Sequence, residues 1–202
     1  MGTSQKSLLI IFYRNPRLGA VKTRLAATLG KERALAIFQK LALHTKNITA
    51  RLVMDKAVFY SDVVEQDDVW PPSAFLKLEQ NGADLGERMK NAFANGFDMG
   101  YDTISIIGTD CHELTGAIID QAFESLASVD AVVGPAADGG YYLLGMRKFY
   151  PALFNGKQWS TDTVLKETVE DFESMGLTYS KLQVLHDVDR KEDLPANWID
   201  GP

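Results

Sequence analysis

The segment from Ile104 to Asp110 constrains the fold more than any other part of the chain. It is a short, β-branched and almost unbroken apolar run that ends in a glycine, a threonine and an aspartate. A strand that is apolar on both faces is typical of a parallel sheet covered by helices. Because ligands of open α/β sheets bind just outside the carboxyl ends of the strands, Asp110 is expected at a ligand site. Its carboxylate could hold a hard cation such as Mg²⁺; alternatively, it caps a helix that begins near Thr115.

Strand-like and helix-like segments alternate along the whole chain. Strands are predicted at residues 7–13, 57–61, 78–80, 104–110, 131–135, 141–146 and 182–185. Helices are predicted at residues 21–50 with a break at Gly30, and at 85–97, 115–126 and 161–175, the last capped by Ser160 or Thr161. This alternation predicts a three-layer α/β/α sandwich with a mostly parallel sheet, as one domain over residues 1–202. The strand at 141–146 follows its predecessor so closely that it should run antiparallel or bend away.

The composition narrows the class of protein. With 46% hydrophobic and 24% charged residues, the chain is typical of a globular protein. No apolar run reaches the length of a membrane span, and the first six residues do not resemble a secretory signal. The net charge of −6 argues against general nucleic-acid binding. The single cysteine, Cys111, excludes an internal disulfide and is consistent with a reducing cytoplasm. We expect it to be packed rather than reactive.

Positive charge is concentrated near the N terminus. The connection between the first strand and the first helix carries Arg14, Gly19, Lys22 and Arg24. Backbone N–H groups and the helix dipole bind phosphate at such connections, and Lys and Arg side chains add charge. The loop is not a Walker A sequence, because Val21 stands where the glycine should be. It indicates a phosphate site, with a solvated helix face as the alternative.

Two later segments combine turn residues with aromatic rings. Asp138 opens a sharp turn between two strands, at which paired glycines allow positive φ or close approach of a ligand. The residues of these segments that could line an acceptor pocket are Gly139, Gly140, Tyr141, Trp159, Ser160 and Thr161. The alternatives are a plain hairpin with tyrosines packed in the core, and a purely structural helix cap.

Five blocks resemble the motifs of a known family. They are residues 15–25, 80–89, 107–111, 134–145 and 159–161, and they span nearly the whole chain in the expected order. Together they are similar to a family of small bacterial glycosyltransferases with the nucleotide-diphospho-sugar transferase (GT-A) fold. The similarity extends, more distantly, to phospholactate and molybdenum-cofactor guanylyltransferases. One departure is His112, where the family usually has proline; we expect it to face solvent rather than to bind metal.

The resemblance implies roles for several residues. Asp110 and Asp189 would hold Mg²⁺ or Mn²⁺, and Gln80 and Gly82 would lie where the family reads the nucleobase. Asp189 could instead cap a C-terminal helical turn. The segment with Gln80 could also be a simple loop that enters a helix with Asp84 as its N-cap.

Two reactions fit these roles. In glycosyl transfer the donor is a nucleotide-sugar, and Asp138 would serve the hydroxyl of a small-molecule acceptor. In nucleotidyl transfer an acceptor phosphate attacks a nucleoside triphosphate, and Lys22 and Arg24 neutralise the departing pyrophosphate. The basic loop, which also carries Arg17, favours a triphosphate, whereas the family favours glycosyl transfer. A third hypothesis is a non-catalytic nucleotide-binding regulator.

Overall fold

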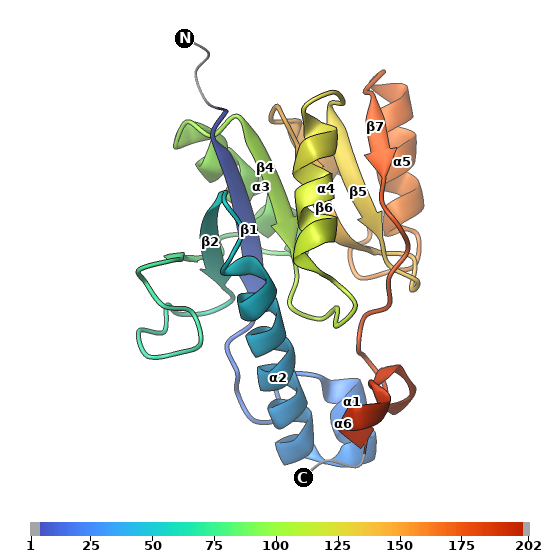
Figure 1. The fold of residues 1–202 in the computed structure, drawn as a ribbon. Helices are drawn as coiled ribbons and strands as arrows, with labels where there is room; N and C mark the ends of the chain where they lie inside the picture. Colours follow the sequence, from blue (N-terminus) through green and yellow to red (C-terminus); the bar gives the residue numbers. More distant parts are fainter. Residues whose placement is uncertain (1–4, 200–202) are drawn as a thin grey trace.

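The computed structural model describes residues 5–199, in which seven strands form one sheet (Figure 1). The strands are β1 (Ser7–Tyr13), β2 (Asp55–Tyr60), β3 (Leu76–Glu79), β4 (Thr103–Ile107), β5 (Ala131–Pro135), β6 (Tyr141–Met146) and β7 (Tyr179–Lys181). Their order is β3-β2-β1-β4-β6-β5-β7. Only β6 runs against its neighbours, β4 and β5, so the predicted antiparallel strand and mostly parallel sheet are confirmed.

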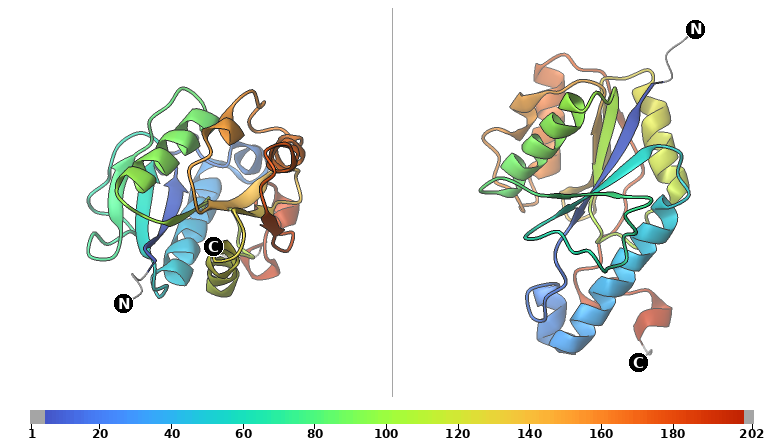
Figure 2. Two further views of the ribbon diagram at one scale, coloured as in Figure 1. Left: turned by 90° about the horizontal axis from the view of Figure 1, so that it is seen from above. Right: turned by 90° about the vertical axis from the view of Figure 1, so that its left-hand side faces the viewer.

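Helices cover both faces of the sheet. They are α1 (Thr23–Leu29), α2 (Lys31–Thr49), α3 (Leu85–Asp98), α4 (Gly116–Leu126), α5 (Val164–Ser174) and α6 (Ala196–Ile199), with 3₁₀ turns η1 (Pro151–Phe154) and η2 (Lys191–Asp193). Figure 2 (right) shows α3 and α5 on one face and α2 and α4 on the other, which confirms the three-layer sandwich. Among the described residues, no helix is both long and apolar enough to cross a membrane.

The central strands separate two hydrophobic cores because their side chains alternate. Leu9 and Ile11 of β1 face α2 and α4, whereas Leu8 and Ile10 face α3 and α5. All five residues of β4 are buried, as expected for a strand that is apolar on both sides. Burial on both faces of β4 therefore explains why its apolar residues follow one another almost without interruption rather than at every second position.

Two predicted boundaries near the C terminus are wrong. The last strand is not 182–185 but β7, three residues earlier, because β7 pairs with the start of β5. Leu185 makes only an isolated bridge to Ala136. Helix α5 begins at Val164 with Thr163 as its N-cap residue, so neither Ser160 nor Thr161 caps it.

The sheet has a topological switch point between β1 and β4. The chain leaves β1 towards β2 on one side, while β4 joins β1 from the other. In such sheets the connections diverge at the carboxyl ends of the strands and leave a crevice between them. The loop after β1, the loop after β4 and helix α1 all lie at this end of the molecule (Figure 1).

Candidate functional site

A cavity of about 960 Å³ opens at the carboxyl ends of β1 and β4. The predicted site residues that line it are Arg14, Lys22, Arg24, Gln80, Asp110, Asp138, Gly140, Tyr141, Trp159, Ser160, Thr161 and Asp189. Three predicted glycines, Gly19, Gly82 and Gly139, are not among the lining residues. Segments far apart in the sequence therefore meet in one cavity at the switch point.

Three charged side chains converge at the centre of this cavity. The ammonium Nζ of Lys22 lies 2.8 Å from Asp110 Oδ1 and 3.5 Å from Asp189 Oδ1. Only 4% of the Lys22 side chain is exposed, against 48% and 41% for the two aspartates. The guanidinium of Arg24 lies on the solvent side, 3.0 Å from Asp189 Oδ2.

Neither aspartate caps a helix. Thr115 caps α4, since its side chain accepts a hydrogen bond from the backbone N–H of Ile118. At the C-terminal turn, the carboxylate of Asp193 accepts hydrogen bonds from the backbone N–H groups of Asp189 and residue 190. The capping alternatives for Asp110 and Asp189 are therefore wrong, and both carboxylates are directed at the Lys22 ammonium.

The remaining basic residues of the first loop differ in position. Arg14 is exposed at the cavity wall, and its guanidinium donates a long hydrogen bond, 3.5 Å, to the carbonyl of Ala20. Gly19 has a φ of +75°, so it shapes the turn rather than the wall. Arg17 does not line the cavity, which reduces the positive charge on which the triphosphate interpretation depends.

The Gln80 segment forms a second wall. Gln80 Nε2 donates to the carbonyl of Phe59 at 2.8 Å, and Gln80 Oε1 accepts from Arg88 at 3.4 Å. Arg88 Nε also donates to the carbonyl of Gly82 at 3.1 Å. Asp84 is the N-cap of α3, as the alternative predicted. Arg88, one helical turn further on, therefore adds a cationic side chain to this wall.

The turn after β5 forms the third wall. Asp138 Oδ1 accepts a hydrogen bond from the backbone N–H of Gly140 at 2.9 Å. Gly139 has a φ of +90°, and a Cβ there would lie 2.1 Å from the carbonyl oxygen of Asp162. Tyr141 lines the cavity, and its hydroxyl points to Met89 of α3. The turn is therefore packed against the segment that precedes α5, and the predicted hairpin also contributes to the cavity.

That preceding segment carries Trp159, whose indole packs on α3. A Cβ at Gly86 would lie 2.0 Å from Trp159 Nε1, so only glycine fits beneath the ring. Ser160 has a φ of +66°, and Thr161 donates from its hydroxyl to the carbonyl of Gln158 at 2.7 Å. These contacts fix a tight turn that presents all three side chains to the cavity.

Sequence reasoning missed three charged residues of the cavity: Arg88, Asp162 and Asp187. Burial raises the pKa of Asp187 to about 7, and the negative charges of Asp110 and Asp138 act in the same direction. The alternation of Asp187, a buried Val188 and Asp189 is the signal that could have revealed it, because alternate residues of an extended segment point the same way.

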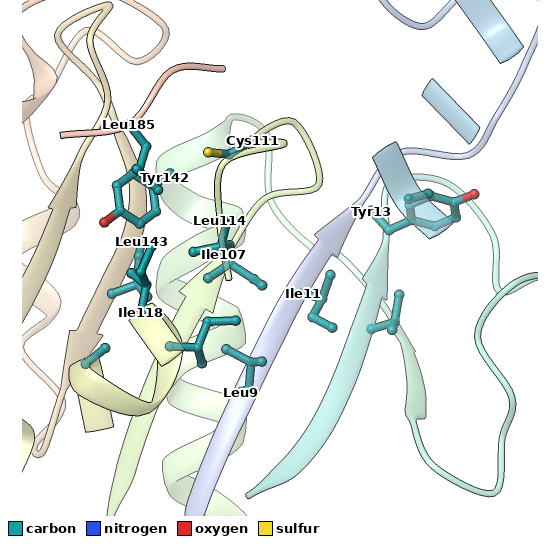
Figure 3. Close-up of a cluster of buried hydrophobic side chains, with 14 of the residues drawn as sticks. Leu9, Ile11, Tyr13, Ile107, Cys111, Leu114, Ile118, Tyr142, Leu143 and Leu185 are labelled. Atoms are coloured by element: carbon teal, nitrogen blue, oxygen red, sulfur yellow. The ribbon is translucent and has the colours of Figure 1, made fainter. Parts of the chain in front are cut away.

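Cys111 lines the cavity, whereas His112, the next residue, does not, and neither joins the charged cluster. Cys111 is 5% exposed and sits among the apolar side chains between the sheet and α4 (Figure 3). His112 stacks on His44 at 4.9 Å and meets the ring of Trp198 at 4.7 Å. The expectation of a packed cysteine is confirmed, but His112 is half-buried in an aromatic cluster rather than facing solvent freely.

The donor atoms of the central cluster suit a divalent metal. Asp110 and Asp189 direct two carboxylates at one cationic position, and Mg²⁺ is typically held by one or two carboxylates together with phosphate oxygens and waters. Over residues 5–199, no group of three or more His, Cys, Asp or Glu side chains is arranged to hold a metal. A metal bound here would therefore take its remaining ligands from substrate and water.

This architecture is the nucleotide-diphospho-sugar transferase fold. The crystal structure of a protein from Desulfovibrio desulfuricans G20, provisionally described as a nucleotide-diphospho-sugar transferase, is 33% identical with a TM-score of 0.88. The match covers 93% of this chain and 84% of that chain. The chain belongs to the family described as uncharacterized proteins conserved in bacteria (DUF2064), whose sequence profile matches residues 42–161.

More distant structures share the fold. A cytidylyltransferase from Leptospira borgpetersenii serovar Hardjo-bovis is 12% identical with a TM-score of 0.58, over 94% of this chain and 84% of that chain. The inositol-1-phosphate CTP transferase from T. maritima is 10% identical with a TM-score of 0.55, over 99% and 96%. No curated protein matches the sequence significantly. The predicted fold family is thereby confirmed.

Proposed function

We propose that the protein is a metal-dependent transferase that takes a nucleotide-sugar donor and transfers the sugar to an acceptor hydroxyl. The observation that carries this proposal is the convergence of Asp110, Asp189 and Lys22 at the switch point of the sheet. The same cavity includes the basic loop after β1 and the turn with Asp138. The name of the D. desulfuricans relative supports the same class of donor.

The donor diphosphate would bind beside the loop after β1. Arg14, Lys22 and Arg24 would contact its oxygens, each charge-assisted contact contributing roughly 1.5–3 kcal/mol. A divalent metal held by Asp110 and Asp189 would supply Lewis-acid stabilisation of the leaving diphosphate. The side chains would thus act by positioning and by charge stabilisation, without a covalent nucleophile.

The acceptor would bind between the turn after β5 and the Trp159 segment. The backbone N–H of Gly140 holds Asp138 Oδ1, and no described residue donates a hydrogen bond to Asp138 Oδ2. Oδ2 is therefore the oxygen that would take the proton of an attacking hydroxyl. Trp159 offers a ring against which a sugar could pack.

The charges of the acceptor side support a hydroxyl acceptor. The cationic side chains that line the cavity come from the loop after β1, from the first turn of α1 and from α3. Within the described residues, the charged lining residues of the turn after β5 and of the segment before α5 are Asp138 and Asp162. An acceptor phosphate would meet these carboxylates without a compensating cation, which is unfavourable. This favours glycosyl transfer over attack by a phosphorylated acceptor.

Nucleotidyl transfer is the second candidate. It is supported by the basic loop and by the cytidylyltransferases that share the fold. Calorimetry with CTP, UTP, GTP, UDP-glucose and GDP-mannose, each with Mg²⁺, separates the candidates. We expect a nucleotide-sugar to bind more tightly than any triphosphate. Preference for a triphosphate would favour nucleotidyl transfer, and no binding of any of these compounds would contradict both transferase candidates.

A further inference from the structure

The position of Lys22 differs from that of an ordinary phosphate-binding lysine. Its ammonium is buried against Asp110 and reaches Asp189, whereas Arg24 meets Asp189 from the solvent side with 67% of its side chain exposed. Lys22 therefore fills the point at which the two carboxylates converge. This is the same point that a divalent cation would need.

The local backbone and the hydrogen bonding of Lys22 are both unusual. Its φ of 48° and ψ of 49° place it in the left-handed region, and within residues 5–199 only Lys22 and Ser160 are non-glycine residues with a positive φ. Strained conformations of this kind concentrate at functional sites. Nζ also has no hydrogen-bond partner of good geometry in the described chain, although it lies within ion-pair distance of both carboxylates. An ammonium group with unused N–H donors would be stabilised by hydrogen bonds to phosphate oxygens.

We infer that Lys22 is a resident cation that holds the metal position in the ligand-free protein and leaves it for the donor phosphates when metal and nucleotide bind together. This inference rests on the proposed function. Metal alone must displace a buried ammonium without offering it a phosphate in exchange, so it binds weakly. Metal with nucleotide offers that ammonium new partners, so the two ligands bind cooperatively.

The test is a titration with Mn²⁺ alone, followed by calorimetry or electron paramagnetic resonance. Lys22→Met removes the ammonium and keeps the length of the side chain, and we expect it to raise the affinity for Mn²⁺ by about tenfold or more over the wild type. Arg24→Met removes a charge from the same carboxylate pair at the surface and should change the affinity by less than about threefold. Unchanged or weaker Mn²⁺ binding by Lys22→Met would overturn the inference.

Two further measurements separate this inference from the proposed function. The double variant Lys22→Met with Asp110→Asn should lose the gained affinity, and retention of the gain would place the Mn²⁺ elsewhere and overturn the inference. Lys22→Asn, which tolerates the left-handed backbone, replaces Lys22→Met if unfolding curves show that the latter is poorly folded. If the wild type binds Mn²⁺ only together with nucleotide, and Lys22→Met does not bind Mn²⁺ in the absence of nucleotide, then Lys22 is not a resident cation. The transferase proposal would remain intact in that case. Failure of every variant to bind Mn²⁺, with or without the five nucleotides above, would contradict the proposed function itself.

Discussion

Substitution of Gly86 by alanine should force Trp159 off helix α3. The added Cβ would lie 2.0 Å from Trp159 Nε1 and 2.3 Å from Cε2, and neither a planar indole nor a helix backbone can absorb that overlap by a small shift. Overpacking typically costs about 1–3 kcal/mol. The better helix propensity of alanine offsets up to about 1 kcal/mol of this cost. We expect the free energy of unfolding to fall by about 1–2 kcal/mol in urea denaturation followed by circular dichroism.

The Trp159→Ala background provides the control, because it removes the ring that the new methyl group would meet. There the same Gly86→Ala change should reverse its sign and stabilise the protein by up to about 1 kcal/mol. Equal destabilisation in both backgrounds would refute the packing argument and show that Gly86 is required for another reason.

Three other predictions concern separate parts of the molecule. Hydrogen bonds from Thr178, with a smaller contribution from Arg147, lower the pKa of Asp130 below its usual 3.8. The ionised Asp130 carboxylate therefore stabilises the fold at pH values above 3.8, and this stabilisation is lost as the pH falls through the lowered pKa. Asp130→Asn should accordingly cost about 1 kcal/mol at pH 7 and almost nothing near pH 2, and a pH-independent loss in urea titrations would contradict this. Burial raises the pKa of Cys111 to about 12, so iodoacetamide should modify it slowly at pH 8 until the protein unfolds; rapid modification of folded protein would show that it is accessible. Arg24→Met should weaken binding of the preferred nucleotide by about one to two decades and leave the nucleoside almost unaffected, whereas equal losses would mean that Arg24 does not face phosphate.

The central strands are predictable because both of their faces are buried, so that consecutive residues are apolar. The bounds of β1 agree with the prediction, since the apolar run from Ser7 to Tyr13 coincides with the paired segment. The prediction fails at β7, where the run at 182–185 suggested a strand. There Leu182 and Leu185 are buried but Val184 is 57% exposed, and pairing with β5 selects the preceding residues instead. Pairing between distant strands is not visible in a local pattern.

The site is predictable to the extent that its residues follow strands and turns. Asp110 and the basic loop follow β4 and β1, so topology brings them together. The inward direction of Lys22 is not predictable in this way, because it depends on a left-handed backbone conformation that a lysine rarely adopts. Arg88 was missed because a cationic residue on a predicted helix resembles any solvated surface residue.

The most direct test of the proposed site is nucleotide binding by Asp110→Asn, measured by calorimetry with and without Mg²⁺. If Asp110 holds the metal, the variant should lose metal-dependent binding of the preferred nucleotide by about a hundredfold or more while its circular dichroism spectrum stays native. Asp189→Asn, which removes the second carboxylate, should reduce it by less. Wild-type binding that never requires metal, or an Asp110→Asn variant that binds Mg²⁺ and nucleotide as the wild type does, would contradict the proposed metal site.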